Sequence, residues 1–286
     1  MTSFFKTTLL LGLMTGLLMV LGGLVGGRHG VAIAFVFAAV LNFFSYWFSD
    51  KIVLRAYNAQ ELDAQSEPEL YSIVNELAHA ASIPMPRLYL IASDTPNAFA
   101  TGRNANHAAV AVTRGIMRIC TRDELKGVIG HELSHVTNHD ILTSSIVATM
   151  AGAIMMLGTM IRWGALFGLG RDDEEGGGLE GLLIGGILAP IAATLIQLAI
   201  SRTREYQADA SGANLTHHPL YLASALRKLE AANERMPLDA SPSTAHMFIV
   251  NPLSAKGIAR LFSTHPPIDE RIHRLERMSS GQTAIG

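Results

Sequence analysis

The stretch HELSHVTNHD, from His131 to Asp140, begins with the pattern His-Glu-x-x-His and contains three histidines four residues apart. On a helix this spacing places His131 and His135 one turn apart on the same face, so both imidazoles can reach one Zn²⁺ ion. Glu132 then lies beside the ion, where its carboxylate can take a proton from a water molecule. The pattern also occurs by chance on helices whose histidines are only buried or solvated, so a metal site needs a third ligand.

The third histidine of the stretch is a poor candidate for that ligand. On a straight helix His139 lies ~12 Å along the axis from His131, too far for both to share an ion with bonds of ~2.1 Å. The stretch EYQAD offers Glu205 and Asp209, two carboxylates on one face of a helix. Glu205 would complete a His₂Glu site with one open position, and Asp209 could accept a hydrogen bond from a ligand imidazole. The alternative is two solvated acids that balance nearby arginines.

Four stretches carry no formal charge: residues 7–27, 29–49, 141–161 and 181–201. Each is long enough to cross the ~30 Å hydrocarbon core of a bilayer as a helix that rises ~1.5 Å per residue. Hydrophobic residues make up 49% of the chain and charged residues only 16%, which suits a membrane protein better than a soluble one. We therefore expect four transmembrane helices. A cleaved signal peptide fits less well, since the second span follows at once without a cleavage site.

The spans divide the chain into four parts: an N-terminal membrane hairpin (1–50), a first catalytic part (51–140), a second hairpin (141–201) and a second catalytic part (202–286). An even number of crossings puts both catalytic parts and the N-terminus on one side of the membrane. That side carries more basic residues near the spans, namely Lys6, Lys51, Arg55, Arg202 and Arg204. The excess of Lys and Arg predicts that this side faces the cytoplasm.

Two further features of the composition bear on compartment and partners. Cys120 is the only cysteine, so no disulfide can form within the chain, as suits a reducing compartment. The net charge of −2 and the lack of a basic stripe give no indication of nucleic-acid binding.

The soluble parts contain helices and a few short strands. Thr121 followed by Glu124 forms a capping box, which opens the helix that holds His-Glu-x-x-His. With no breaker after it, this helix is predicted to run on into the third span. Residues 87–93 and 108–113 have the pattern of strands, with NAFATG (97–102) between them. The predicted fold is therefore mainly α-helical with a small antiparallel β-sheet.

HELSH and EYQAD, with NAFATG upstream and HPPIDERI near the C-terminus, resemble the HtpX family over essentially the whole chain. Members of this family are bacterial membrane-bound zinc endopeptidases, similar to the eukaryotic CAAX prenyl proteases. The resemblance implies a gluzincin-like metalloprotease domain on the cytoplasmic side of the inner membrane, with a role in the stress response and protein quality control. It implies one Zn²⁺ ion per chain, held by His131, His135 and Glu205, with Glu132 as general base. The implied substrates are polypeptides, namely misfolded or damaged membrane proteins.

The resemblance also assigns roles that spacing alone leaves open. The edge strand that binds the substrate backbone would be formed by Asn97, Ala98, Phe99 and Ala100. His265 would donate a hydrogen bond to the tetrahedral oxyanion, and Arg271 would support the site through Asp209. From the sequence alone, His265 is an ordinary histidine before a pair of prolines.

Two other functions are compatible with a helical membrane protein. A transporter or channel would need polar or charged groups inside the spans, where the sequence offers only Asn42, Gln197 and a few hydroxyls. A zinc-stabilised membrane scaffold without catalysis would have no use for Glu132 or for an open coordination position. The combined motifs therefore favour a membrane-integral zinc endopeptidase.

Overall fold

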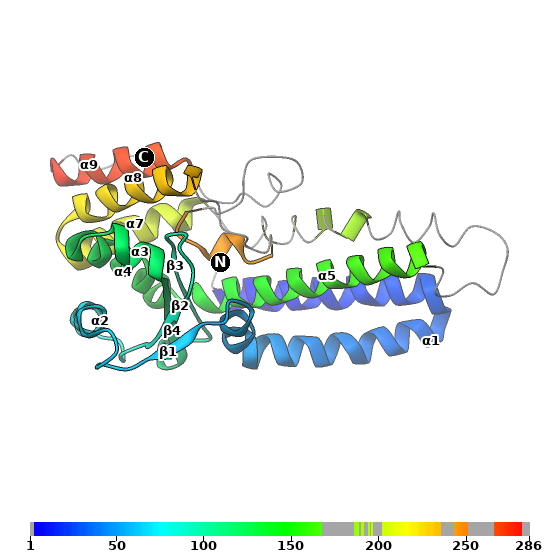
Figure 1. Ribbon diagram of the computed structural model, residues 1–286. Helices are drawn as coiled ribbons and strands as arrows, with labels where there is room; N and C mark the ends of the chain where they lie inside the picture. Colours follow the sequence, from blue (N-terminus) through cyan, green and yellow to red (C-terminus); the bar gives the residue numbers. More distant parts are fainter. Residues whose placement is uncertain are drawn as a thin grey trace.

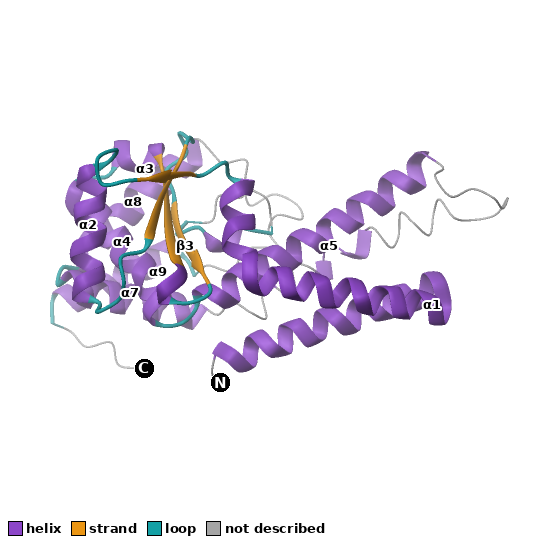
Figure 2. Cartoon of the chain, turned by 90° about the horizontal axis from the view of Figure 1, so that it is seen from below, coloured by secondary structure: helices purple, strands orange, loops and turns teal. Residues whose placement is uncertain are grey.

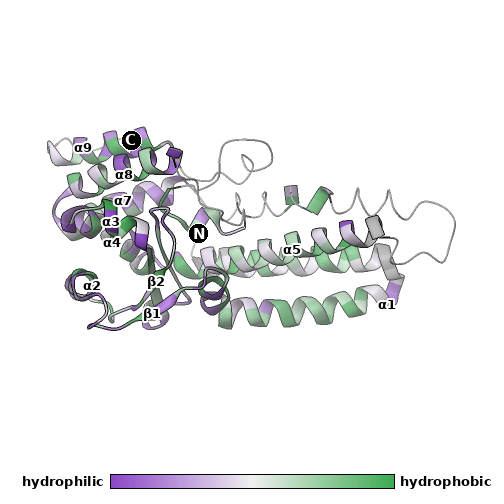
Figure 3. Ribbon diagram, viewed as in Figure 1, coloured by the Kyte–Doolittle hydropathy of each residue, from purple (hydrophilic) through white to green (hydrophobic). Residues whose placement is uncertain are grey.

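The computed structural model describes residues 3–167, 202–235, 243–250 and 266–281, together with positions 186–188, 190, 191, 194 and 196. Figure 1 shows a compact part that holds the sheet and the shorter helices, and a rod formed by the long helices α1 (Ser3–Ala56) and α5 (Ile141–Phe167). Hydrophobic residues follow the rod, whereas hydrophilic residues are concentrated in the compact part (Figure 3). His265 and most of the predicted fourth span lie outside the described residues.

The helix α1 consists of two antiparallel arms joined at a kink. Gly26 and Gly27 leave the helical conformation, and Gly27 has a φ of 55°, which glycine adopts without a steric cost. The arms touch at Gly22 and Gly30, where a Cβ on Gly22 would lie 2.4 Å from the carbonyl oxygen of Gly30. The missing side chains allow the two backbones to pack closely. The arms correspond to the first two predicted spans.

Two described helices are long and apolar enough to cross a membrane, Gly26–Ala56 and Ile141–Trp163, and a third apolar helix, Thr7–Gly23, is shorter. In the most apolar window of Gly26–Ala56 only 11% of the residues are buried, so its apolar side chains face outward rather than into a protein core. The polar Asn42 is bonded within the hairpin through its Nδ2, which donates to Thr15 Oγ1 at 2.9 Å and to Leu11 O at 3.3 Å. By length and composition, the described residues thus contain two helices that could cross a membrane, at the positions of the second and third predicted spans.

Among the described residues, the sheet has the strands β1 (Gln60–Leu62), β2 (Arg87–Ile91), β3 (Ala98–Gly102) and β4 (Ala108–Thr113), in the order β1-β2-β4-β3. β2 and β4 are parallel, whereas β1 with β2 and β3 with β4 are antiparallel. The prediction of an antiparallel sheet is therefore wrong, and the sheet is mixed. The chain reverses between β2 and β3 and again between β3 and β4, so β2 and β4 run in the same direction and β3 forms an edge.

The remaining elements are α2 (Pro68–Ala80), α3 (Arg114–Ile119), α4 (Arg122–Thr137), α7 (Arg202–Thr216), α8 (Pro219–Arg235), α9 (Ile268–Ser279) and the 3₁₀ turns η1 (Ala105–His107) and η2 (Ala245–Met247). The helix α4 is central, since it packs against α2, α7, α8 and β3. It begins at the predicted capping box, in which Thr121 N donates to Glu124 Oε2 at 2.7 Å and Glu124 N donates to Thr121 Oγ1 at 3.3 Å. Figures 1 and 2 both place the sheet between these helices and the rod.

The helix α4 does not continue into α5, so the prediction of one unbroken helix is wrong. It ends in a Schellman motif, in which Asp140 N donates to His135 O at 2.9 Å and His139 N donates to Val136 O at 3.2 Å. His139 has a φ of 59°, in the left-handed conformation that glycine or asparagine usually takes at this position. Since no glycine is present, nothing in the sequence marks the break.

Candidate metal centre

A close crossing of α4 and α7 brings the motif residues of the two helices together. Gly130 and Gly212 lie at this crossing, and a Cβ on Gly212 would be 2.7 Å from the backbone nitrogen of His131. Any side chain at position 212 would therefore push α7 away from α4. Glu205 lies about two turns before Gly212 on α7, which brings its carboxylate to His131 and His135.

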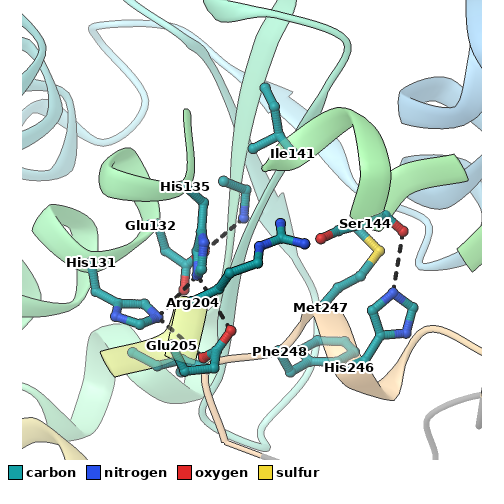
Figure 4. A pocket seen from close by; sticks show the side chains of 12 residues that line it. His131, Glu132, His135, Ile141, Ser144, Arg204, Glu205, His246, Met247 and Phe248 are labelled. Carbon is teal, nitrogen blue, oxygen red and sulfur yellow. Dashed lines mark hydrogen bonds and ion pairs between the residues drawn. The ribbon is translucent and has the colours of Figure 1, made fainter. Parts of the chain in front are cut away.

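His131, His135 and Glu205 bring their ligand atoms to within 4.8 Å of one another. The two Nε2 atoms are 3.3 Å apart, and each lies 3.8 Å from a carboxylate oxygen of Glu205. Ligand atoms ~2.1 Å from one tetrahedral ion lie roughly 3.4 Å apart, so the three groups fit Zn²⁺ in spacing and in chemistry. Figure 4 shows the three side chains turned toward one another. His139, at the break after α4, is exposed and does not belong to this cluster.

A carboxylate and a guanidinium lie behind His131. Nδ1 of His131 is 2.8 Å from Asp209 Oδ1. Arg271, which is fully buried, donates to both oxygens of Asp209, from Nε at 2.8 Å and from Nη2 at 2.7 Å. Asp209 is therefore placed to accept a hydrogen bond from Nδ1–H, so that Nε2 of His131 keeps its lone pair for a metal.

Burial and this ion pair set the protonation states around His131. Burial lowers the pKa of His131 to about 4, although the hydrogen bond to Asp209 opposes the shift. Burial would raise the pKa of Asp209, but the charge of Arg271 outweighs it and the pKa falls to about 2. Near pH 7 Asp209 is therefore ionised and His131 is neutral, which are the states that metal binding requires.

His135 lies among more carboxylates than His131 does. Burial lowers the pKa of His135, but the neighbouring carboxylates of Asp140, Glu205 and Glu132 outweigh burial, so the pKa lies above its ordinary value. Metal binding needs the neutral imidazole and so displaces a proton from this ring. On a continuous helix Asp140, five residues after His135, would point away from that side chain, so the spacing along the chain does not mark it as a partner of His135.

Glu132 lies beside the cluster but does not supply one of its ligand atoms. Its carboxylate is buried, and Oε2 accepts a hydrogen bond from the backbone N–H of Ala100 at 2.8 Å. Burial raises the pKa of Glu132 to about 8, and the charge of Glu205 adds to the effect. A divalent cation nearby would lower this pKa, because it stabilises the carboxylate. A carboxyl group tuned toward neutral pH can both take up and release a proton.

The outer edge of β3 faces the cluster. Asn97 O accepts a hydrogen bond from β4 at 3.0 Å, so the polar backbone groups of Ala98 and Ala100 point to the other side. There the N–H of Ala100 donates to Glu132, and Ala98 O accepts a hydrogen bond from the N–H of Ile249 at 3.3 Å. One edge of the sheet thus contacts both the Glu132 carboxylate and a distant part of the chain.

That part is the segment 243–250, which covers the outer edge of β3. All of its residues are buried. Its Val250 O accepts a hydrogen bond from Asn97 Nδ2 at 3.2 Å, and its Phe248 packs edge to face on Phe99 with ring centroids 5.4 Å apart. The segment is therefore held on β3 by both backbone and side-chain contacts, although no sequence motif marked it.

A cavity of about 20 Å³ lies between the cluster and the segment 243–250, which is room for about one water molecule. Its walls are formed by Ala100, His131, Glu132, His135, Ile141, Ser144, Arg204, Glu205, His246, Met247, Phe248 and Ile249. The cavity thus joins the three candidate ligands to β3, to the start of α5 and to the segment 243–250. No sequence motif marks the residues contributed by α5 and by this segment.

Comparisons with known proteins place this arrangement among peptidases. A family model described as Peptidase family M48 matches residues 64–279. A protein described as "Protease HtpX homolog" from Syntrophobacter fumaroxidans (strain DSM 10017 / MPOB) is 59% identical over 282 residues, which cover 97% of this chain and 100% of that protein. A second protein described as "Protease HtpX homolog", from Desulfatibacillum aliphaticivorans, is 56% identical over 285 residues, which cover 98% of this chain and 92% of that protein. The crystal structure of S. mikatae Ste24p is similar in fold, with a TM-score of 0.52 and 18% identity over 93% of this chain and 63% of that one.

Proposed function

The chain belongs to peptidase family M48, and we propose that it is a membrane-integral zinc endopeptidase that cleaves misfolded or damaged membrane proteins on the cytoplasmic side. The observation that carries this function is the largely buried cluster of His131, His135 and Glu205 with the Glu132 carboxylate beside it. A zinc-stabilised scaffold would need the three ligands, but it would not need a buried carboxyl group beside them that supplies no ligand atom.

Each group of the site would perform one task. His131, His135 and Glu205 would hold one zinc ion, which when bound supplies a Lewis acid that polarises a carbonyl group and makes water nucleophilic near neutral pH. Glu132 takes a proton from the attacking water and passes it to the amine that leaves. The hydrogen bond from Ala100 holds the Glu132 carboxylate at β3, beside the position proposed for the substrate backbone.

We assign the stabilisation of the oxyanion to His265, as the resemblance to HtpX proteases implies. A zinc hydrolase must stabilise negative charge on the carbonyl oxygen, and a protein hydrogen-bond donor usually shares that task with the metal. His265 lies outside the described residues, but Pro266 and Pro267 connect it directly to α9. That helix carries Arg271, which donates to Asp209, so this part of the chain is tied to the metal centre.

The outer edge of β3, from Asn97 to Ala100, would bind the substrate backbone. A peptide paired with this edge would lie beside Glu132, because Ala100 already donates to that carboxylate. Ile249 occupies Ala98 O in the structure, and a cavity of about 20 Å³ has no room for a peptide. The segment 243–250 would therefore have to leave the edge before a substrate could bind there.

The surroundings of the cavity support substrates at a membrane surface. Ile141 and Ser144 line the cavity and belong to the first turn of the apolar helix α5. Exposed aromatic residues near the end of α1 form a group of the kind found where helices leave a bilayer: Phe43, Phe44, Tyr46 and Trp47. The guanidinium of Arg103, just after β3, lies 4.6 Å from the Trp47 ring. The proposed substrate-binding edge is thus attached to the aromatic residues that would mark the membrane surface.

Removal of zinc tests the proposed activity. The purified full-length protein should degrade an unfolded test protein, lose that activity in a zinc chelator and regain it when Zn²⁺ is added, because the ligand side chains remain in place. Mass spectrometry of the products should show internal cuts rather than trimming from the ends. Undiminished proteolysis by protein shown to be free of metal would contradict the zinc mechanism.

Cysteine labelling tests the proposed topology, in which the catalytic parts 51–140 and 202–286 lie in the cytoplasm and the hairpin 141–201 crosses the membrane twice. Burial raises the pKa of Cys120 to about 12, so the native thiol reacts poorly, and Cys120→Ser removes it altogether. In this background Asp173→Cys should react with a membrane-impermeant thiol reagent added outside intact cells, and Ser280→Cys should not. Labelling of Ser280→Cys alone would mean that the orientation is inverted.

A further inference from the structure

The carboxylate of Asp140 lies on the Nδ1 side of His135, and the carboxylate of Asp209 lies on the Nδ1 side of His131. Asp140 Oδ2 is 3.6 Å from Nδ1 of His135, which is an ion-pair contact somewhat longer than a hydrogen bond. Nε2 of His135 faces the cluster, 3.8 Å from Glu205 Oε1. When this ring binds a metal through Nε2, Nδ1 must carry the proton, and the Asp140 carboxylate is placed to accept a hydrogen bond from this Nδ1–H.

The break between α4 and α5 produces this contact. Each residue of a continuous helix turns ~100° about the axis, so Asp140 would point ~140° away from His135. The Schellman motif instead returns the chain, with His139 at a φ of 59° and Asp140 N bonded to His135 O at 2.9 Å. A non-glycine residue in this left-handed conformation is uncommon.

Arg204 holds Asp140 in this position. Its Nη2 lies 2.7 Å from Asp140 Oδ1 and donates to the backbone oxygen of Asp140 at 3.2 Å. Only 13% of the Arg204 side chain and 12% of the Asp140 side chain are exposed, so salt screens this pair much less than a surface pair. Arg204 directly precedes Glu205, so the pair connects the helix of the third ligand to the end of α4.

The two ligand histidines are therefore supported in the same way, each by a carboxylate that is bound to a guanidinium: Asp209 with Arg271 and Asp140 with Arg204. Together with Glu132 and Glu205, the site contains four carboxylates and two guanidiniums. With all four acids ionised, one divalent cation balances the charge. The pair formed by Asp140 and Arg204 adds no net charge, so it places a carboxylate beside His135 without altering the charge balance with a bound Zn²⁺ ion.

We propose that Asp140 and Arg204 are positioning residues for His135: Asp140 accepts the Nδ1–H of the imidazole, and Arg204 holds the Asp140 carboxylate. The inference rests on the proposed metal site and extends it by two residues that neither sequence motif includes. A hydrogen-bonded carboxylate fixes the ring so that Nε2 faces the ion, and it also makes Nε2 more basic. Both residues act through His135.

The test is the zinc affinity of the full-length protein, measured by competition with a chromogenic chelator. Asp140→Ala should lower the affinity ~10–100-fold, the range typical for losing the partner of a metal-binding histidine. Asp50→Ala is the matched control, because Asp50 lies 2.7 Å from Arg87 and has 13% of its side chain exposed, but this pair is not part of the metal centre. The control should bind zinc as tightly as the wild type.

Further variants separate positioning from folding. In Co²⁺-substituted protein the visible absorption bands report ligand geometry, so they should change in Asp140→Ala and not in Asp50→Ala.

Asp140→Asn keeps an oxygen acceptor for Nδ1–H and should recover part of the lost affinity. Arg204→Gln should lose less than Asp140→Ala, and the double variant should lose no more than Asp140→Ala alone, because Arg204 acts through Asp140. If Asp140→Ala fails to fold, the Asn and Gln variants carry the same test.

The outcomes distinguish this inference from the proposed function. If the wild type binds one zinc ion per chain and Asp140→Ala binds it equally tightly, the positioning role is overturned and the metal site stands. Equal losses in Asp140→Ala and Asp50→Ala would overturn it as well, since the ion pair would then serve only the fold. A wild-type protein that does not bind zinc would overturn both proposals.

Discussion

Replacing Glu132 by glutamine should abolish proteolysis while one zinc ion stays bound per chain. The carboxylate lies next to His131, His135 and Glu205, but it does not supply one of the ligand atoms that converge there. Glutamine has nearly the same size, and its amide oxygen can still accept the hydrogen bond from Ala100, so the site keeps its shape. The amide cannot take a proton from water, and a general base contributes ~10²–10⁴-fold to turnover.

The measurements for Glu132→Gln are zinc content and cleavage of an unfolded test protein, made on the same preparation. Glu69→Gln is a suitable control, since the Glu69 side chain on α2 is 64% exposed and should affect neither quantity. A joint loss of zinc and activity in Glu132→Gln would show that Glu132 holds the metal or the fold. Turnover close to that of the wild type would show that another group takes the proton.

The beginning of α4 could be predicted from the sequence, whereas its end could not. The capping box is a contact between Thr121 and Glu124, three residues apart, so the local sequence specifies it. The break after α4 requires His139 in a left-handed conformation that no glycine marks. It also brings Asp140 to Arg204, a contact between residues 64 positions apart. A long-range ion pair of this kind leaves no trace in the spacing along one helix.

The order and direction of the strands in the sheet also depend on contacts that the local sequence does not specify. The residue patterns of β2 and β4 identify them as strands, but a pattern says nothing about which strands become neighbours or in which direction they pair. β4 lies between β2 and β3, and the β2–β4 pair is parallel because the chain reverses between β2 and β3 and again between β3 and β4. β1 has three residues, too few for any periodicity to appear. Strand order therefore had to come from the structure.

The candidate site likewise has one part that the local sequence predicts and another part that depends on long-range contacts. The spacing of His131 and His135 places both on one face of α4, so this half of the site is local. Glu205 and Asp209 come from α7, and their spacing fits solvated acids equally well, whereas the structure shows both buried. The two hydrogen bonds that hold the segment 243–250 on β3 use its backbone groups, which every residue possesses, so no motif could mark them.

Replacing Glu205 by alanine should remove zinc from the protein, whereas replacing His139 by alanine should leave the zinc content near that of the wild type. Glu205 supplies the carboxylate that lies 3.8 Å from both Nε2 atoms, and without it two imidazoles would have to hold the ion alone. The loss of affinity should exceed the ~10–100-fold that follows from losing a group behind a ligand. The exclusion of His139 no longer depends on a straight helix, since its side chain is exposed at the break and outside the cluster.

Two more variants sharpen the comparison, which is made by metal analysis after dialysis against a chelator. Glu205→Gln keeps the size of the side chain but removes its charge, and it should also lose zinc, because an amide is a weak ligand for this ion. His139→Gly suits the left-handed conformation better than alanine, so it removes the imidazole without disturbing the break. If the His139 variants lost zinc and the Glu205 variants kept it, the ligand set would be three histidines, and the close crossing of α4 and α7 would have no part in metal binding.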